Sequence, residues 1–328
     1  MEYWLPVVYM AIMGFALLIY VILDGYDLGV GMLLPLAEEP EKDVMVASIG
    51  PFWDANETWI VLGVGVLLIA FPAAHGLVLT SLYLPVTLML FGLILRGVAF
   101  DLRVKAGDHR RQLWNRAFFG GSLVAATAQG WMLGAYVTGL GGGGLGLGFS
   151  LLIALTLPAL YLLLGSAWLL LKTEGELLRK AGDWARVALW PMGLGLVLVS
   201  VATPLVSAEI ADKWFHWSNA LLLAPIPLGC ALSFAIMVHR LYRRRDAHRT
   251  WVPFGCTIAV CVLASMGLAY SVFPDIVIGR MTIWEASASV DSLLFTLVGI
   301  VITLPFILFY TIYIYRVFRG PVSELSYH

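Results

Sequence analysis

The stretch PVVYMAIMGFALLIYVILDGYDLGVGMLL, residues 6–34, carries only two charged side chains, Asp24 and Asp27. A helix rises about 1.5 Å per residue, so a run of this length can cross the roughly 30 Å hydrocarbon core of a membrane. We therefore expect a membrane-spanning helix here. Its two carboxylates require an explanation, because a charged side chain inside hydrocarbon is costly.

Apolar blocks of similar length recur along the whole chain. Hydrophobic residues make up 60% of the 328 residues, against 20 Lys and Arg and 21 Asp and Glu. This composition excludes a soluble enzyme, a disordered chain and a collagen, and a net charge of −1 excludes a nucleic-acid partner. We expect an all-α polytopic membrane protein that forms a single integral membrane domain over residues 1–328. The nine predicted spans are 6–34, 49–72, 77–100, 117–137, 149–171, 187–206, 220–241, 251–273 and 291–316.

Basic residues are unevenly shared between the loops that join these spans. The loops predicted on one side are rich in Arg and Lys, namely Asp101–Arg116, Lys172–Arg186 and His239–Arg249. The last three loops predicted on the other side carry only Lys213 and Arg280. By the positive-inside rule the basic loops are cytoplasmic, which predicts an outside N-terminus and an inside C-terminus.

Ionisable residues within the predicted spans gather toward this cytoplasmic side. Asp24 and Asp27 stand three residues apart and so share one helix face, as do Asp54 and Glu57 in the second span. Arg96 lies at the inner end of the third span. The sequence therefore predicts four carboxyl groups and one guanidinium at a similar depth, and we regard the four acids as candidates for a proton route.

Two interpretations of this cluster compete. In the structural one, Arg96 neutralises a carboxylate as an ion pair and Asp54 caps the second helix. In the functional one, crowded carboxyl groups take up and release protons. Polar neighbours, Asn56, Thr58 and Tyr26, then add hydroxyl and amide steps or hold water. The single positive charge of Arg96 cannot neutralise four carboxylates, which favours the functional interpretation for the group as a whole.

Residue types that hold cofactors do not form a pattern in the spans. A haem needs His or Met ligands inside the bundle, but every histidine falls at a predicted span end, in a loop or at the terminus: His75, His109, His216, His239, His248 and His328. The three cysteines lack metal-ligand spacing and are predicted to be packing residues. The run Gly139–Gly148 has no P-loop Lys and is predicted to be a flexible external turn. We therefore expect neither a metal nor a haem ligated by this chain.

Five motifs in order resemble subunit II of the cytochrome bd-type quinol oxidases. They are DGYDLGVGMLLP, IGPFWDANETWIVLG with the following AFP, RGVAFDLR, RMTIWEASAS and the final YRVFRG. The likeness extends from Asp24 to Arg319, and the short form is similar to the cyanide-insensitive branch. It implies nine helices, arranged as two four-helix groups plus one, in the bacterial cytoplasmic (inner) membrane.

The resemblance also implies a partner and a division of labour. A haem-bearing subunit I would form a heterodimer with this chain, hold the b-type haems and haem d, and oxidise quinol while O2 is reduced to water. A small third subunit and a quinone bound as a lipid are further candidates. Within the chain, the family's WD motif implies a role in the proton route for Asp54, supported by Trp53 and Asn56. The DGxDxGxG motif implies a role in the proton route for Asp27 as well. Glu57 stands where some members of the family have Gln.

Two other classes of membrane protein fit parts of this pattern. A proton-coupled secondary transporter also has buried acids and helices interrupted by proline. A purely structural membrane partner has the same spans but tolerates neutral residues at Asp54. Solute uptake by the isolated chain would favour the first of these, and unchanged oxidase turnover after loss of Asp54 would favour the second.

Overall fold

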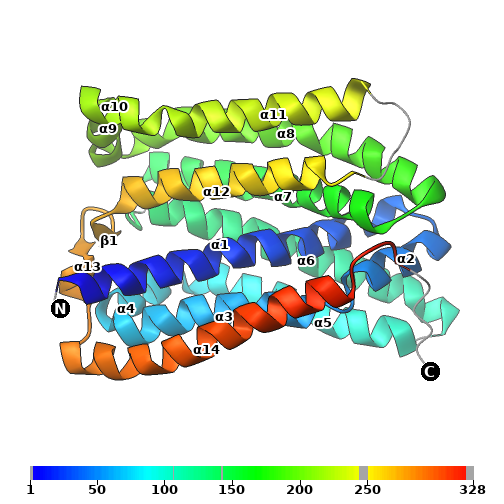
Figure 1. The fold of residues 1–328 in the computed structure, drawn as a ribbon, viewed down its shortest axis with the longest axis horizontal. Coiled ribbons are helices and arrows are strands. Elements are labelled where there is room, and N and C mark those ends of the chain that lie inside the picture. Colours follow the sequence, from blue (N-terminus) through cyan, green and yellow to red (C-terminus); the bar gives the residue numbers. More distant parts are fainter. Residues whose placement is uncertain (1–2, 106, 142, 244–249, 323–328) are drawn as a thin grey trace.

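The computed structural model describes residues 3–105, 107–141, 143–243 and 250–322. Within these residues the protein is a bundle of long helices that run roughly side by side (Figure 1). The long helices are α1 (Trp4–Leu33), α3 (Trp53–Ala70), α5 (Tyr83–Lys105), α6 (Asp108–Val137), α7 (Gly144–Lys172), α8 (Gly175–Val206), α11 (Pro225–Arg243), α12 (Val252–Val272) and α14 (Val290–Val317). The predicted all-α membrane fold is confirmed.

Short elements connect the long helices at the two ends of the bundle. They are the 3-10 turn η1 (Leu34–Leu36), the helices α2 (Glu39–Ile49), α4 (Pro72–Ser81), α9 (Ala208–Phe215), α10 (Trp217–Leu223) and α13 (Ile283–Ala286), and an antiparallel pair of strands, β1 (Asp275–Val277) and β2 (Met281–Thr282). Several segments predicted to be loops are therefore helical. The basic segment 172–186 is mostly the start of α8, and the turn around 139–148 ends where α7 begins at Gly144.

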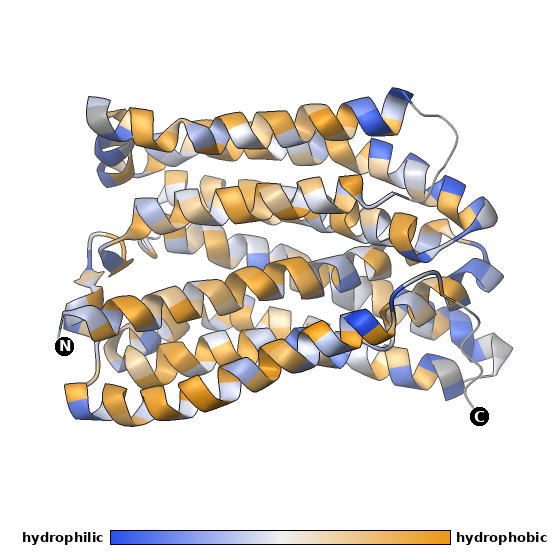
Figure 2. Ribbon diagram, viewed as in Figure 1, coloured by the Kyte–Doolittle hydropathy of each residue, from blue (hydrophilic) through white to orange (hydrophobic). Residues whose placement is uncertain are grey.

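Eight helical segments in the described part of the chain are long and apolar enough to span a membrane. They correspond to eight of the nine predicted spans. The remaining prediction, 117–137, lies within α6, which is 30 residues long but more polar than the others. Figure 2 shows apolar residues along the length of the helices and hydrophilic residues concentrated toward the ends of the bundle. The count of nine is thus approximate, whereas the spanning architecture follows from length and composition.

The end of the bundle opposite the start of α1 is formed by the last turns of several long helices (Figure 1). Four helices finish there with basic residues in their last turns: Arg103 and Lys105 of α5, Lys172 of α7, Arg240 and Arg243 of α11, and Arg316 of α14. Basic side chains at the C-terminal end of a helix also interact favourably with the negative end of its dipole. Three arginines of the predicted basic loop, in residues 244–249, lie outside the described residues. We call this end of the bundle the basic end.

Helices α1 and α7 approach each other closely through glycines. A Cβ atom added to Gly29 would lie 1.8 Å from the carbonyl oxygen of Tyr161, and one added to Gly165 would lie 2.5 Å from the carbonyl carbon of Gly29. Small residues at such positions allow two helix backbones to come into contact inside a membrane. The close approach buries the second half of α1, including both of its aspartates.

Gly29→Ala is expected to push α1 and α7 apart, because the new methyl group meets backbone atoms that cannot rotate away. We expect a loss of about 1–3 kcal/mol or more in the free energy of unfolding. The measurement is the thermal unfolding of the detergent-purified protein. Gly14→Ala on the same helix is the control, since nothing lies within 4 Å of a Cβ there. Equal stability of the two variants would contradict the proposed backbone contact.

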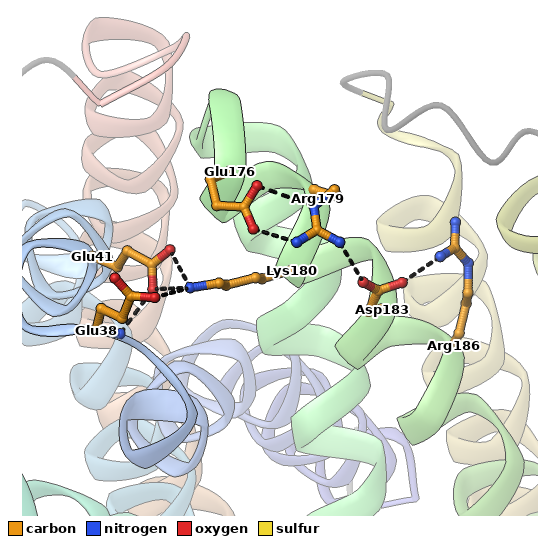
Figure 3. Close-up of polar contacts among 7 residues, drawn as sticks. All are labelled: Glu38, Glu41, Glu176, Arg179, Lys180, Asp183 and Arg186. Carbon is orange, nitrogen blue, oxygen red and sulfur yellow. Dashed lines mark hydrogen bonds and ion pairs between the residues drawn. The ribbon is translucent and has the colours of Figure 1, made fainter.

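An ion-pair network joins α2 to α8 at the basic end (Figure 3). Lys180 of α8 lies with its Nζ 3.0 Å from Glu38 Oε1 and 2.8 Å from Glu41 Oε1. Glu41 also accepts a hydrogen bond from the backbone N–H of Glu38, which forms a capping box at the start of α2. Partial burial tends to raise the pKa of Glu41, but the bonds from Lys180 and Glu38 outweigh it and hold that pKa below its ordinary value.

Replacing Glu41 with Gln is expected to destabilise the protein by less than about 1 kcal/mol near neutral pH. Because the folded-state pKa of Glu41 is lowered, its stabilisation is present above the unfolded value and is lost as the pH falls through the folded value. The difference in melting temperature between wild type and Glu41→Gln should therefore shrink under acidic conditions. Glu174→Gln, at an exposed glutamate of the same end, is the matched control, and a pH-independent difference would contradict the assignment.

Candidate functional site

The two aspartates of α1 lie in the interior of the protein, and both are completely buried. They occupy one face of α1, as their three-residue spacing predicts. Gly25 and Gly29 on the same helix have no side chain, which lets α7 come close enough to exclude solvent. Burial of two carboxyl groups on one helix requires polar partners from neighbouring helices.

Arg96 of α5 provides the cationic partner. Its side chain is 2% exposed, and its Nη2 atom lies 2.6 Å from Asp24 Oδ1 and also contacts Glu57 Oε1. A single guanidinium thus bridges a carboxyl group from α1 and one from α3. The Glu57 side chain remains 29% exposed, so this cluster extends from a buried aspartate to a partly accessible glutamate.

Asp27 has a different kind of partner. The side-chain nitrogen of Asn56, on α3, donates to Asp27 Oδ2 at 2.7 Å. The same nitrogen lies 2.9 Å from the hydroxyl of Tyr26, while the Asn56 oxygen accepts from the Tyr315 hydroxyl at 3.1 Å. Asn56 therefore connects the acid of α1 with two tyrosines, one of which comes from the last helix.

A second polar chain runs from α1 into α6 and α7. The hydroxyl of Tyr161 donates to Gln129 Oε1 at 2.6 Å, and Gln129 Nε2 donates to the hydroxyl of Tyr20 at 2.8 Å. Tyr20 lies one helical turn before Asp24. Nothing in the sequence spacing indicates this chain, because its members belong to three helices that are distant along the sequence.

Asp54 does not join the buried group. Its side chain is exposed in the first turn of α3, one turn before Glu57. The N-cap position of that helix belongs to Phe52 and has no side-chain capping bond, so the structural role predicted for Asp54 as a cap is wrong. Its neighbour Trp53 packs against Phe100, with ring centroids 5.0 Å apart. The four acids therefore form a gradient from the exposed Asp54, through Glu57, to the two buried aspartates.

Several buried polar atoms in this region have no hydrogen-bond partner among the described residues. They include Oδ2 of Asp24, Oδ1 of Asp27, and Nε and Nη1 of Arg96. Buried polar groups are nearly always satisfied by protein or by ordered water. The arrangement thus suits water molecules that would link the two acids of α1.

The described residues contain no group of three or more His, Cys, Asp or Glu side chains that could hold a metal ion. His75 lies in α4, His216 between α9 and α10, and His239 in α11. The side chains of His109, His248 and His328 lie outside the described residues. Cys230 and Cys261 are buried, Cys256 is partly buried, and each is a free thiol.

Arg96→Met is expected to destabilise the protein by about 3–5 kcal/mol, because it leaves Asp24 and Glu57 without their counter-charge in an apolar interior. The yield and melting temperature of the purified protein measure this effect. Adding Asp24→Asn to the same chain should recover part of the loss, since it removes one of the unpaired acids. Arg280→Met, at an exposed position near the opposite end, is the control; an equally severe effect there, or no recovery in the double variant, would contradict the ion-pair assignment.

The fold and the polar interior together define a helical membrane subunit with buried acids near one end. Residues 5–318 match the family of the cytochrome bd terminal oxidase subunit II. The chain belongs to this family, which confirms the resemblance found in its sequence motifs.

Similar proteins cover nearly the whole chain. Cytochrome bd ubiquinol oxidase subunit 2 of Bacillus subtilis is 29% identical over 98% of this chain and 97% of its own length. Cytochrome bd-I ubiquinol oxidase subunit 2 of Escherichia coli is 27% identical over 95% of this chain and 94% of its own. A chain of the bd oxidase from Geobacillus thermodenitrificans has the same fold, with a TM-score of 0.77 and 17% identity over 96% of this chain and 98% of that one.

Proposed function

We propose that this protein is subunit II of a bd-type quinol oxidase and that its buried acids form part of a proton route for the reduction of O2 to water. Family membership and the names of its relatives support the assignment to an oxidoreductase complex. In this proposal the chain works in a heterodimer with subunit I in the bacterial inner membrane. Its substrates are those of the complex, a quinol and O2.

The haems of the complex, b-type and d, are assigned to subunit I in this proposal. They would supply the electron transfer and O2 chemistry, while the present chain contributes residues that bind and move protons. The described histidines lie near the ends of α4, α9 and α11 and not in the middle of the bundle, which supports this division.

The observation that carries the proposal is the gradient of acids from the surface to the interior. Asp54 is exposed, Glu57 is partly exposed, and Asp24 and Asp27 are fully buried. A proton taken up at Asp54 would pass along the α3 face to Glu57 and reach the α1 acids through water held by their unpartnered oxygens. Arg96 keeps Asp24 and Glu57 close together, and Asn56 holds Asp27 beside them.

The direction of this route follows from the distribution of charge. The acids lie toward the basic end, which the positive-inside rule assigns to the cytoplasm. Protons consumed in the reaction would then come from the inside, while quinol releases its protons outside. Each proton charge separated in this way is worth about 2.3 kcal/mol per 100 mV of membrane potential.

Asp27→Asn should lower quinol-driven O2 uptake by about tenfold or more, because an amide cannot take up and release the proton that the route requires. The measurement uses the purified complex with subunit I, and its haem content reports assembly. Asp291→Asn, at an exposed aspartate in the first turn of α14, is the matched control and should retain turnover.

Other outcomes would support the alternative classes. Full turnover of Asp27→Asn with unchanged haem content would refute the proton route and favour a scaffold. Proton-driven uptake of a solute by vesicles that contain only this chain would favour a secondary transporter.

A further inference from the structure

Ser122 of α6 is fully buried, and its hydroxyl bonds to no residue that the structure describes. A serine inside a helix commonly satisfies its hydroxyl by donating to a carbonyl oxygen of the preceding turn. Ser166 of α7, which is equally buried, does so with the carbonyl oxygen of Leu163 at 3.1 Å. Ser122 makes no such bond, so the cost of removing its hydroxyl from water is not offset by a contact within the described chain.

The hydroxyl of Ser122 is directed toward α1. A Cβ atom added to Gly31 would collide with Ser122 Oγ, so this oxygen occupies the space beside that glycine. Gly31 lies four residues after Asp27 and therefore on the same face of α1. The hydroxyl thus lies about one helical turn along α1 from the buried carboxyl group of Asp27.

The same turn of α6 is also in contact with α5. A Cβ atom added to Gly121, the residue before Ser122, would lie 2.9 Å from the backbone nitrogen of Arg96. Arg96 is the residue whose guanidinium pairs with Asp24 of α1. Ser122 therefore lies where α1, α5 and α6 meet, next to the buried ion pair.

Other buried polar atoms around this meeting point have no hydrogen-bond partner in the described part of the chain. They are Oδ2 of Asp24, Oδ1 of Asp27, and Nε and Nη1 of Arg96. The carboxylate oxygens accept hydrogen bonds, the guanidinium N–H groups donate them, and a hydroxyl can do both. A buried water typically makes about three hydrogen bonds to such groups. The set thus offers the donors and acceptors that a bound water requires.

The two acids are held at a separation that one water can bridge. Arg96 fixes Asp24 from α5, and Asn56 fixes Asp27 from α3. Residues three apart on a helix have Cβ atoms about 5–6 Å apart. Two consecutive hydrogen bonds of about 2.8 Å each, one on either side of a water oxygen, cover the same distance.

We propose that Ser122 is a positioning residue that holds a buried water between Asp24 and Asp27, and that protons pass between the two acids through this water. The water accepts a proton from the protonated Asp24 carboxyl group and donates one of its own to the Asp27 carboxylate, so it is unchanged afterwards. Ser122 keeps its own proton and acts only by fixing the water. The proposal rests on the proton route proposed above and adds a residue of α6 to it.

The test is Ser122→Ala in the purified complex with subunit I, with turnover expressed per haem. We expect quinol-driven O2 uptake to fall by about fivefold, the effect of losing one buried hydrogen bond, without a change in the KM for quinol. The ratio of turnover in H2O to turnover in D2O should rise above that of wild type, because the slowed step is a proton transfer. A residue that only fills space would leave this ratio unchanged.

Ser166→Ala is the matched control, because that serine is equally buried but its hydroxyl already bonds to the Leu163 carbonyl. It should retain the turnover and the isotope ratio of wild type. Ser122→Cys keeps the shape of the side chain with a weaker donor, so its turnover should lie between those of Ser122→Ala and wild type. If Ser122→Ala fails to assemble, Ser122→Cys carries the test.

The melting temperature gives an independent readout. If the Ser122 hydroxyl were simply unpaired, its removal would stabilise the protein, because the cost of burying it would disappear. We expect no such gain, since the hydroxyl is bonded to the water. A higher melting temperature together with unchanged turnover would refute the water site.

The outcomes also distinguish this inference from the proposed function. If Asp27→Asn lowers turnover but Ser122→Ala has the turnover and isotope ratio of Ser166→Ala, the role of Ser122 is refuted and the proton route stands. If Asp27→Asn leaves turnover intact, the proton route itself fails. Ser122→Ala added to Asp27→Asn should have no further effect on turnover, because both changes act on one step, and full additivity would contradict this coupling.

Discussion

A buried guanidinium between two carboxyl groups is the constraint on which the polar interior of this bundle depends. Arg96 is almost fully buried and contacts Asp24 of α1 and Glu57 of α3, so it fixes three helices at one depth. A charge left unpaired there would cost several kcal/mol. With Arg96 engaged in this way, Asp27 has the neutral amide of Asn56 as its hydrogen-bond partner, and this difference is one reason why we propose Asp27 as a group that exchanges protons.

Close helix packing confines this polar group to one part of the molecule. Glycines on α1 and α7 bring their backbones into contact and exclude solvent from the aspartates. On the side toward the basic end, Tyr26 stacks on Trp168 with centroids 4.2 Å apart, and Phe52 packs edge-on against the same indole. The acids are thus enclosed by apolar and aromatic surfaces, and the partly exposed Glu57 links them to the surface.

Much of the fold and part of the site could be predicted from sequence spacing. A three-residue interval placed Asp24 and Asp27 on one helix face, and the depth of Arg96 made it a partner for the acids. The same reasoning grouped Asp54 with them, but Asp54 lies on the exposed face of the first turn of α3, whereas Asn56, two residues later, is buried. Tyr315 escaped prediction altogether, because no periodicity relates a residue of the last helix to an amide about 260 positions earlier.

The amino-acid sequence by itself determined the class of protein, the approximate spans, the enrichment of basic residues at one end of the bundle, and the family. Each of these can be judged from one segment at a time, because every span must be long enough to cross the hydrocarbon core and must carry few charged side chains within it. Only the tertiary structure decided which polar groups meet. Asn56 of α3 meets Asp27 of α1 and Tyr315 of α14 only because these helices pack side by side, and that packing joins side chains remote in sequence.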